Sequence, residues 1–215
     1  RKRACRHGAA KTEEKRKGGR MENGIKRDIR LVGLDLDGTV FTDEKTITPA
    51  TRDAIARAVR AGVAVLPVTG RPRSGLPEEV LAIPGVRYAI TSNGAMCEDL
   101  AEDKVLVRLA MDEETAMRAL RIAEKYDVVI DIYIDGQAYT AADSMRLVQT
   151  HVPESFRPYF LKTRRLVEDR GRFLRQTGRG AEKFTILFQD MAQRAAAWKE
   201  FEHTGLFELS GGISR

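Results

Sequence analysis

The chain has 215 residues and a formal net charge of +6, with 42% hydrophobic and 32% charged residues. This balance is typical of a soluble globular protein and argues against a disordered chain. No apolar run reaches the roughly 20 residues that a membrane-spanning helix needs. The two cysteines, Cys5 and Cys97, are too few for a disulfide framework or a cysteine metal site. We therefore expect reduced thiols, a cytoplasmic protein and no membrane partner.

The positive charge is concentrated at the amino terminus. Residues 1–20 carry a net charge of +7, which leaves −1 for the rest of the chain. A basic segment of this kind could contact nucleic acid or an anionic membrane. We interpret it instead as sequence upstream of the native start, because Met21 opens a stretch that reads as an ordinary amino terminus. We expect residues 1–24 to form a disordered basic tail.

The first predicted strand, residues 29–35, leads into the sequence D-L-D-G-T-V. Its apolar start indicates a buried parallel strand. Because side chains alternate along a strand, Asp35 and Asp37 should point to the same side at its carboxyl end. Ligands bind at that end in open α/β sheets. Two carboxylates placed together repel each other unless a cation lies between them, so this pair is a candidate metal site.

A helix and a second strand follow the first. Thr48 precedes Pro49 as a predicted N-cap for a helix over residues 49–61, and an apolar run over 63–68 predicts the next strand. The strand–helix–strand order predicts a parallel sheet. Pro67 lacks a backbone N–H, so we expect a local irregularity there. The strand ends in Thr69, Gly70 and Arg71, whose polar groups are suited to binding phosphate oxygens.

A third strand is predicted over residues 86–91, and it ends in S-N-G-A. Asn93 could hydrogen-bond a substrate or the neighbouring loops. It could equally be an ordinary turn residue before Gly94, and the sequence leaves both interpretations open.

The chain resembles the haloacid dehalogenase (HAD) superfamily, and within it the Cof-type subfamily IIB. The resemblance rests on three motifs that follow three strands in order: D-L-D-G-T-V, T-G-R and S-N-G-A. The resemblance implies an α/β fold: a Rossmann-like parallel-sheet core with an inserted α/β type-2 cap. It implies a Mg²⁺-dependent phosphatase that hydrolyses a small phosphorylated metabolite through an aspartyl-phosphate. By the same resemblance, Asp35 is the nucleophile and Asp37 the general acid/base, both contribute to the metal site, and the phosphate ligands are Thr69, Gly70, Arg71 and Asn93.

We assign residues 25–110 to the core and 111–215 to the cap. Residues 96–100 and 104–109 predict a hairpin, and Asp135-Gly136 is a tight-turn signal for a second one. The remaining cap elements expected are helices over 113–126, 143–150 and 190–203, and strands over 184–188 and from 206 to 209. We expect Trp198 to lie in the hydrophobic core.

Residues 157–179 contain eight Lys or Arg residues against only Glu168 and Asp169. Nucleic-acid binding is conceivable, but few aromatic residues are interleaved with the basic ones, so the stacking argument is weak. We favour a solvated cap surface that attracts anionic phosphate substrates, and do not expect a nucleic-acid partner.

The resembled family uses two further motifs after its cap, a lysine (motif III) and the acidic sequence G-D-x-x-N-D (motif IV). We find neither; Lys183 and Lys199 fall on a predicted cap strand and a cap helix, and we assign neither of them to motif III. We therefore expect the chain to stop within or just at the end of the cap, which puts catalysis by this chain in doubt. Three alternatives stay open: a phosphomutase with the same chemistry, a non-catalytic phosphate-binding fragment, and a protein that associates with nucleic acid through its basic segments.

Overall fold

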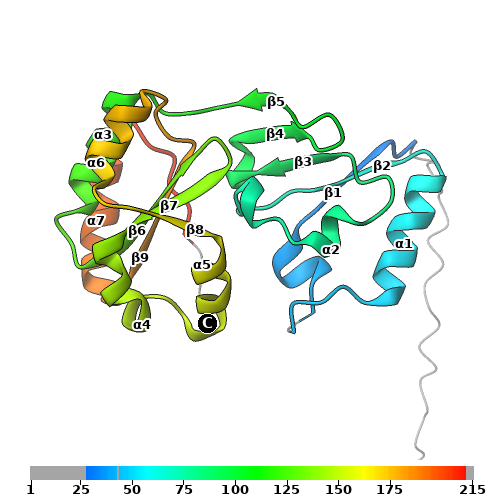
Figure 1. Cartoon of the computed structure of the whole chain (residues 1–215), viewed down its shortest axis with the longest axis horizontal. Coiled ribbons are helices and arrows are strands. Elements are labelled where there is room, and N and C mark those ends of the chain that lie inside the picture. The colour runs from blue at the N-terminus through cyan, green and yellow to red at the C-terminus, as the bar shows by residue number, and fades with distance from the viewer. Residues whose placement is uncertain (1–27, 43, 212–215) are drawn as a thin grey trace, which may run out of the picture.

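The computed structural model describes residues 28–42 and 44–211, and the tail expected at residues 1–24 lies outside this part. The described chain forms two lobes, with strands β1–β5 in one and β6–β9 in the other (Figure 1). A parallel strand pair, two further sheets and covering helices confirm the predicted α/β class. Among the described residues, no helix combines the length and apolar character required to cross a membrane.

The N-terminal lobe contains a parallel pair and an antiparallel three-stranded sheet. Its elements in order are β1 (Leu31–Leu34), the turn η1 (Leu36–Val40), α1 (Pro49–Arg60), β2 (Ala64–Pro67), η2 (Arg73–Gly75), α2 (Glu78–Leu81), β3 (Tyr88–Thr91), η3 (Ser92–Gly94), β4 (Met96–Asp99) and β5 (Lys104–Arg108). β1 pairs with β2 in parallel. β4 and β5 form the predicted hairpin, and β3 adds to it as a third, antiparallel strand. A single parallel bridge, from Val68 to Ile90, connects the two sheets. The ladder is thus interrupted beside Pro67, as expected for a residue without an N–H donor.

The C-terminal lobe is built on one four-stranded sheet with the order β8-β7-β6-β9. Its elements in order are α3 (Glu113–Ala123), β6 (Val128–Ile134), β7 (Gln137–Ala141), η4 (Ala142–Leu147), α4 (Val148–His151), η5 (Glu154–Phe156), α5 (Arg157–Thr163), β8 (Arg164–Val167), α6 (Arg170–Thr177), β9 (Lys183–Phe188) and α7 (Met191–Thr204). The predicted hairpin is present, and its turn residues Asp135 and Gly136 both have positive φ. The helix predicted over 143–150 is instead split into η4 and α4.

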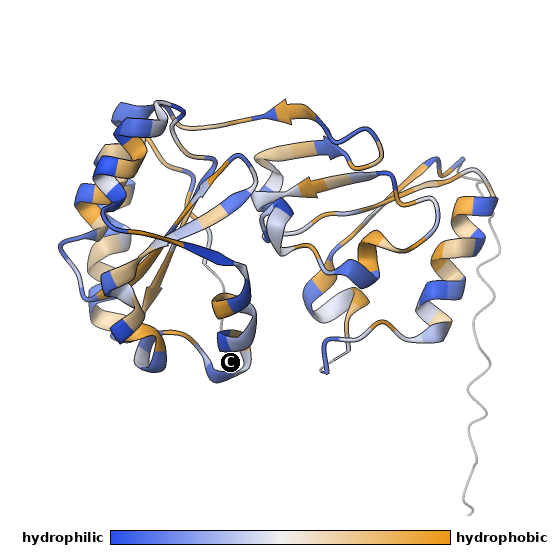
Figure 2. Cartoon of the chain, in the orientation of Figure 1, coloured by the Kyte–Doolittle hydropathy of each residue, from blue (hydrophilic) through white to orange (hydrophobic). Residues whose placement is uncertain are grey.

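Among the described residues the N-terminal lobe has one hydrophobic cluster and the C-terminal lobe has two, the smaller around Phe160. The N-terminal cluster joins side chains of β1, η1, α1, β2 and α2, including Leu36, Ile55 and Val65. The larger C-terminal cluster joins α3, α6 and α7 to one face of the C-terminal sheet, where Ile130 and Ile132 are buried. Figure 2 shows apolar residues along β6 and β9 and a more hydrophilic β8 at the edge. None of these clusters includes residues of both lobes.

Three predicted helix starts are confirmed by side-chain capping. Thr48, Asp112 and Asp190 each accept a hydrogen bond from a backbone N–H in the first turn of α1, α3 and α7. Gly205 ends α7 in a left-handed conformation, which glycine adopts without steric cost.

Three other predictions are wrong. β1 is not buried: Leu31 is 62% exposed, because within the described residues β1 pairs on one side only. Trp198 is partly exposed, and its Nε1 donates to Glu202 while Arg194 lies over its ring. Residues 206–209 form no strand, although Phe207 and Leu209 pack against the cluster of the C-terminal lobe.

Candidate active site

The carboxyl ends of β1, β2 and β3 meet at one edge of the N-terminal lobe. Backbone hydrogen bonds connect the loop after β2 to β3 and to the turn η3 that follows it. Thr69 N donates to Ile90 O (2.9 Å), Ser92 N donates to Arg71 O (2.9 Å), and Asn93 N donates to Thr69 O (3.2 Å). The loop 69–71 and η3 are therefore held as one unit, which brings the predicted phosphate-binding residues together.

Asp37 is the most strongly held carboxylate of this edge. Arg71 Nε and Nη2 donate to its two oxygens at 2.8 Å each, and Lys45 Nζ lies 3.1 Å from Oδ1. Asp37 lies in the turn η1 beyond the end of β1, where Gly38 has a φ of 81°, so the strand alternation we used to orient it does not apply. The turn, rather than the strand, directs this side chain toward Arg71.

The ion pair with Arg71 decides the protonation of Asp37. The hydrogen bond from Arg71 is the largest contribution and holds the pKa of Asp37 below its usual value, with burial opposing it and Lys45 adding to it. Asp37 is therefore ionised in this state at neutral pH. A role as a proton donor requires that Arg71 first transfers its hydrogen bonds to another anion.

Asp35 has a different environment, although it lies only two residues away. It is exposed, and its Oδ1 accepts the backbone N–H of Leu36 at 2.9 Å. Within the described part of the chain, no Lys, Arg or His lies within ion-pair distance of Asp35. One carboxylate of the motif is thus engaged by two cations, while the other stays open to a ligand.

The loop after β2 requires a glycine at its centre. A Cβ on Gly70 would lie 2.5 Å from Asn93 Oδ1 and 3.4 Å from Lys183 Nζ. Thr69 is buried, and its Oγ1 accepts the N–H of Arg71 at 3.2 Å. Asn93 is exposed and adopts a positive φ of 58°, next to Ser92 at 53°. Two consecutive non-glycine residues in this conformation mark a strained turn, which is common at ligand sites.

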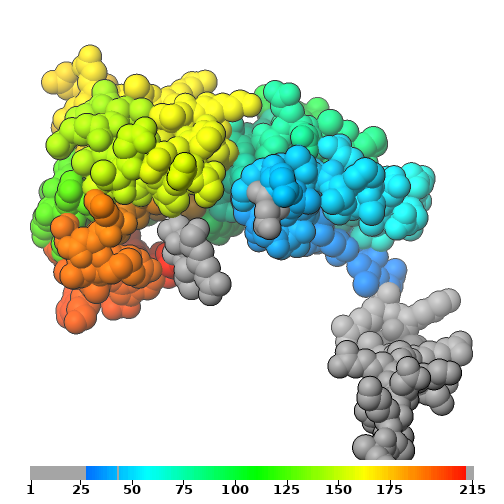
Figure 3. Space-filling view, turned by 90° about the horizontal axis from the view of Figure 1, so that it is seen from below, coloured from blue at the N-terminus to red at the C-terminus, as the bar shows by residue number. Residues whose placement is uncertain are grey.

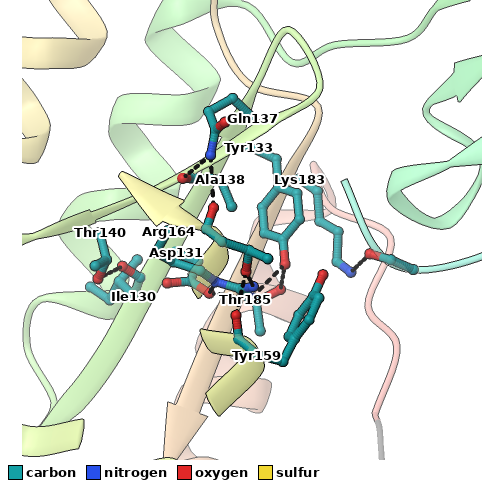
Figure 4. Close-up of polar contacts among 12 residues, drawn as sticks. Ile130, Asp131, Tyr133, Gln137, Ala138, Thr140, Tyr159, Arg164, Lys183 and Thr185 are labelled. Carbon is teal, nitrogen blue, oxygen red and sulfur yellow. Dashed lines mark hydrogen bonds and ion pairs between the residues drawn. The ribbon is translucent and has the colours of Figure 1, made fainter. Parts of the chain in front are cut away.

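Lys183 is a site residue that sequence reasoning did not identify. It lies on β9, as predicted, but its Nζ crosses to the N-terminal lobe and donates to Gly70 O (2.9 Å) and to Asn93 Oδ1 (3.3 Å). Figure 4 shows its side chain extending from the C-terminal lobe toward the neighbouring ribbon. Burial lowers the pKa of Lys183 to about 8. The alternation of Lys183 and Thr185 with apolar neighbours was the available signal that Lys183 faces away from the cluster.

α5 is a second element of the C-terminal lobe that contacts the N-terminal lobe, at the junction where Lys183 meets the loop 69–71. The Tyr159 ring lies 4.3 Å from the guanidinium carbon of Arg71, and its OH packs against Gly75. In Figure 3 the yellow-green segment that contains α5 lies against the blue and cyan N-terminal lobe. The loop 69–71 is therefore covered by two elements of the C-terminal lobe.

The basic segment 157–179 is not uniformly solvated, contrary to our expectation. The side chain of Arg164 is only 2% exposed and donates from Nε and Nη2 to Asp131 Oδ2, which is fully buried. The cause is the start of β8, which places Arg164 beside β7 and inside the lobe. Arg165 and Arg172 are exposed, as the charge pattern suggested.

Residues 32–204 match the family model of the haloacid dehalogenase-like hydrolases. The chain belongs to this family. Its alignment with pyridoxal phosphate phosphatase YbhA of Escherichia coli is 27% identical over 179 residues, covering 81% of this chain and 64% of that relative. The chain thus spans less than two thirds of the length of this relative, and smaller shares of several others.

Solved structures show that the fold is that of the Cof-type, subclass IIB branch of HAD hydrolases. A haloacid dehalogenase-like hydrolase from B. subtilis superposes with a TM-score of 0.64 at 19% identity, covering 81% of this chain and 67% of that one. The HAD subclass IIB sugar phosphatase BT4131 superposes with a TM-score of 0.62 at 18% identity, covering 79% and 62%. The resemblance inferred from three short motifs is therefore confirmed for the family and the fold.

Proposed function

We propose that the protein is a Mg²⁺-dependent HAD phosphatase that hydrolyses a small phosphorylated metabolite through an aspartyl-phosphate on Asp35. The observation that carries this proposal is the bidentate contact of Arg71 with Asp37, between the turn after β1 and the loop after β2. A guanidinium fork that holds a carboxylate suits a phosphate equally well. A pyridoxal phosphate phosphatase among the relatives and a sugar phosphatase among the structural neighbours agree with a substrate of this class.

Asp35 is the proposed nucleophile because it is the open carboxylate. It attacks phosphorus, the ester bond to the leaving oxygen breaks, and an aspartyl-phosphate forms. The hydrogen bond from Leu36 N keeps its Oδ1 in place, which leaves the other oxygen available for attack. Water then attacks the phosphorus of the intermediate and releases phosphate and the free Asp35.

Asp37 is the proposed general acid and base. When a phosphate group enters, Arg71 exchanges its bonds to Asp37 for bonds to phosphate oxygens, and the pKa of Asp37 rises. Asp37 can then protonate the leaving oxygen in the first step and take a proton from water in the second. Thr69, Gly70 and Asn93 are proposed to hold the phosphate together with Arg71.

The described residues fit a magnesium site of the kind that relies on substrate and water. They contain no cluster of three or more His, Cys, Asp or Glu side chains. Mg²⁺ keeps several waters and often uses only one or two carboxylates plus substrate phosphate. The open Asp35 carboxylate and the Asp37 backbone carbonyl would supply two of its ligands, and the acidic motif IV of the family would supply the others. When bound, the ion neutralises charge on the transferred phosphoryl group.

The two lobes have separate proposed roles. Residues 25–110 form the catalytic core, and residues 111–215 form a cap that covers the loop 69–71 and excludes water during reaction. Lys183 and Tyr159 are cap side chains that contact this loop.

The intact protein should hydrolyse phosphomonoesters from a panel of small metabolites in the presence of Mg²⁺, and a chelator should abolish the activity. Released phosphate is the measurement, and restored turnover after adding Mg²⁺ is the control. Turnover that persists after chelation would contradict the metal requirement. Movement of the phosphoryl group from one position of the substrate to another, without release of phosphate, would indicate a phosphomutase. Stabilisation of the protein by phosphate without any turnover would indicate a phosphate-binding role.

A further inference from the structure

One face of the C-terminal sheet is apolar and the other is mixed. The apolar face packs on α3, α6 and α7 through side chains such as Ile132 and Phe184. On the mixed face Val129 and Leu187 pack with Phe160, and the polar side chains follow further along the same strands. Cross-strand pairs place these polar side chains together, because Tyr133 pairs with Lys183 and Asp131 pairs with Thr185. Arg164 joins them through its pairing with Ala138, the partner of Tyr133. Figure 4 shows these side chains gathered on the same side of the sheet.

All charged groups of this face except one have a partner of opposite charge. Arg164 and Asp131 form a buried ion pair at 2.8 Å, and Arg164 also donates to the hydroxyl of Tyr133. Lys183 lies 5.0 Å from the centre of the Tyr133 ring, and its hydrogen bonds go to a carbonyl and an amide oxygen. Across the described ranges, 28–42 and 44–211, no carboxylate lies within 4.0 Å of Lys183 Nζ.

Lys183 is half-buried, and an ammonium that has lost part of its hydration without gaining an anion is unfavourable in free energy. This cost is consistent with the lowered pKa of Lys183, and a bound anion would remove it. The structure holds the ammonium at the junction of the lobes, against Gly70 and Asn93. The anion that would compensate it must therefore enter this junction.

The position of Lys183 separates it from the aspartate end of the site. Lys45 and Arg71 bind Asp37 directly, whereas Lys183 forms no ion pair with Asp35 or Asp37. It reaches the loop 69–71 from the C-terminal lobe, whereas Asp35 belongs to the N-terminal lobe. In an in-line displacement the leaving group departs opposite the nucleophile, so a group held from the C-terminal lobe is suited to contact it. The transferred phosphoryl group has its own ligands, so Lys183 is available for a different group of the substrate.

We infer that Lys183 is a specificity-determining residue that binds a second oxyanion, a carboxylate or a further phosphate, on the leaving group of the substrate. The inference rests on the proposed function and narrows its substrates to phosphomonoesters with an anionic leaving group. The ammonium exchanges the oxygens of Gly70 and Asn93 for that oxyanion when the substrate is bound. Loss of Lys183 should then affect substrates with and without the second charge very differently.

Two phosphonates of similar size, which cannot be hydrolysed, provide a direct test. Binding of propylphosphonate and 3-phosphonopropionate to the full chain is measured by calorimetry. The native chain should bind 3-phosphonopropionate about tenfold more tightly, the effect of one charge-assisted hydrogen bond. Lys183→Met should remove this difference and leave the affinity for propylphosphonate within about twofold. Ethane-1,2-diphosphonate, measured alongside, distinguishes a preference for a second phosphate from one for a carboxylate.

Two control variants sharpen the result. Lys199→Met removes an exposed lysine on α7 and should preserve the preference, and Lys183→Arg should retain a part of it. Equal weakening of both ligands by Lys183→Met would overturn the inference, because Lys183 would then bind the phosphonate itself. If the native chain binds both ligands equally, the inference fails while the proposed function stands. If neither phosphonate nor phosphate binds, the phosphate site of the proposed function fails as well.

Discussion

Replacing Asp35 with Asn should reduce hydrolysis at least about a thousandfold, the largest effect that we expect from any single substitution. The amide is a poor nucleophile for phosphorus, and no other carboxylate can take over, because Asp37 is held by Arg71 and Lys45. The initial rate with a phosphomonoester and Mg²⁺ measures the loss.

The same variant should still bind phosphate, because Thr69 and Arg71 are unchanged and one negative charge is removed. Asp53→Asn is the matched control, since Asp53 is exposed on α1 and far in sequence from the motif. Its rate should equal that of the native protein. Activity of Asp35→Asn close to the native rate would show that Asp35 is not the nucleophile.

Replacing Arg164 with Met should lower the free energy of unfolding by about 3–5 kcal/mol, because it leaves the carboxylate of Asp131 buried without a cation. Asp131 is fully buried and Arg164 nearly so, so water cannot take the place of the guanidinium. For a chain of this length, the loss corresponds to a decrease in melting temperature of about 6–20 °C. Thermal unfolding followed by circular dichroism measures it.

The neighbouring residue provides the control for this prediction. Arg165 is exposed, so Arg165→Met should change the melting temperature by little. Adding Asp131→Asn to Arg164→Met should recover part of the stability, because the buried charge is then gone. Equal melting temperatures for the two single Arg variants would contradict the importance that we assign to the buried pair.

The parts of this site that could be predicted from the sequence are local. The turn after β1, the loop after β2 and η3 each follow an apolar strand directly, and parallel strands bring their carboxyl ends to one edge. The hairpin at Asp135 and Gly136 was equally local, because its turn requires positive φ at both positions. The roles proposed for Asp35, Asp37 and the phosphate ligands stay predictions.

The parts that could not be predicted depend on contacts between distant segments. Lys183 lies 113 residues from Gly70 in sequence, and only the packing of β9 against the junction brings them together. Arg164 belongs to a run of basic residues, and its burial depends on Asp131, 33 residues earlier. Trp198 was wrongly assigned to the core because α7 has an irregular apolar pattern, and Ala197 and Phe201 are buried in its place.

The most direct test of the account is to find which residue carries the phosphoryl group during turnover. The protein is mixed with substrate and Mg²⁺, quenched in acid within the first turnover, and its peptides are examined by mass spectrometry. We expect one added phosphoryl group on Asp35. With a substrate whose leaving group needs no protonation, Asp37→Asn should accumulate more of it, because only the second step then requires Asp37. A phosphoryl group on any other residue, or rapid turnover with no phosphorylated peptide, would contradict the proposal that Asp35 is the nucleophile.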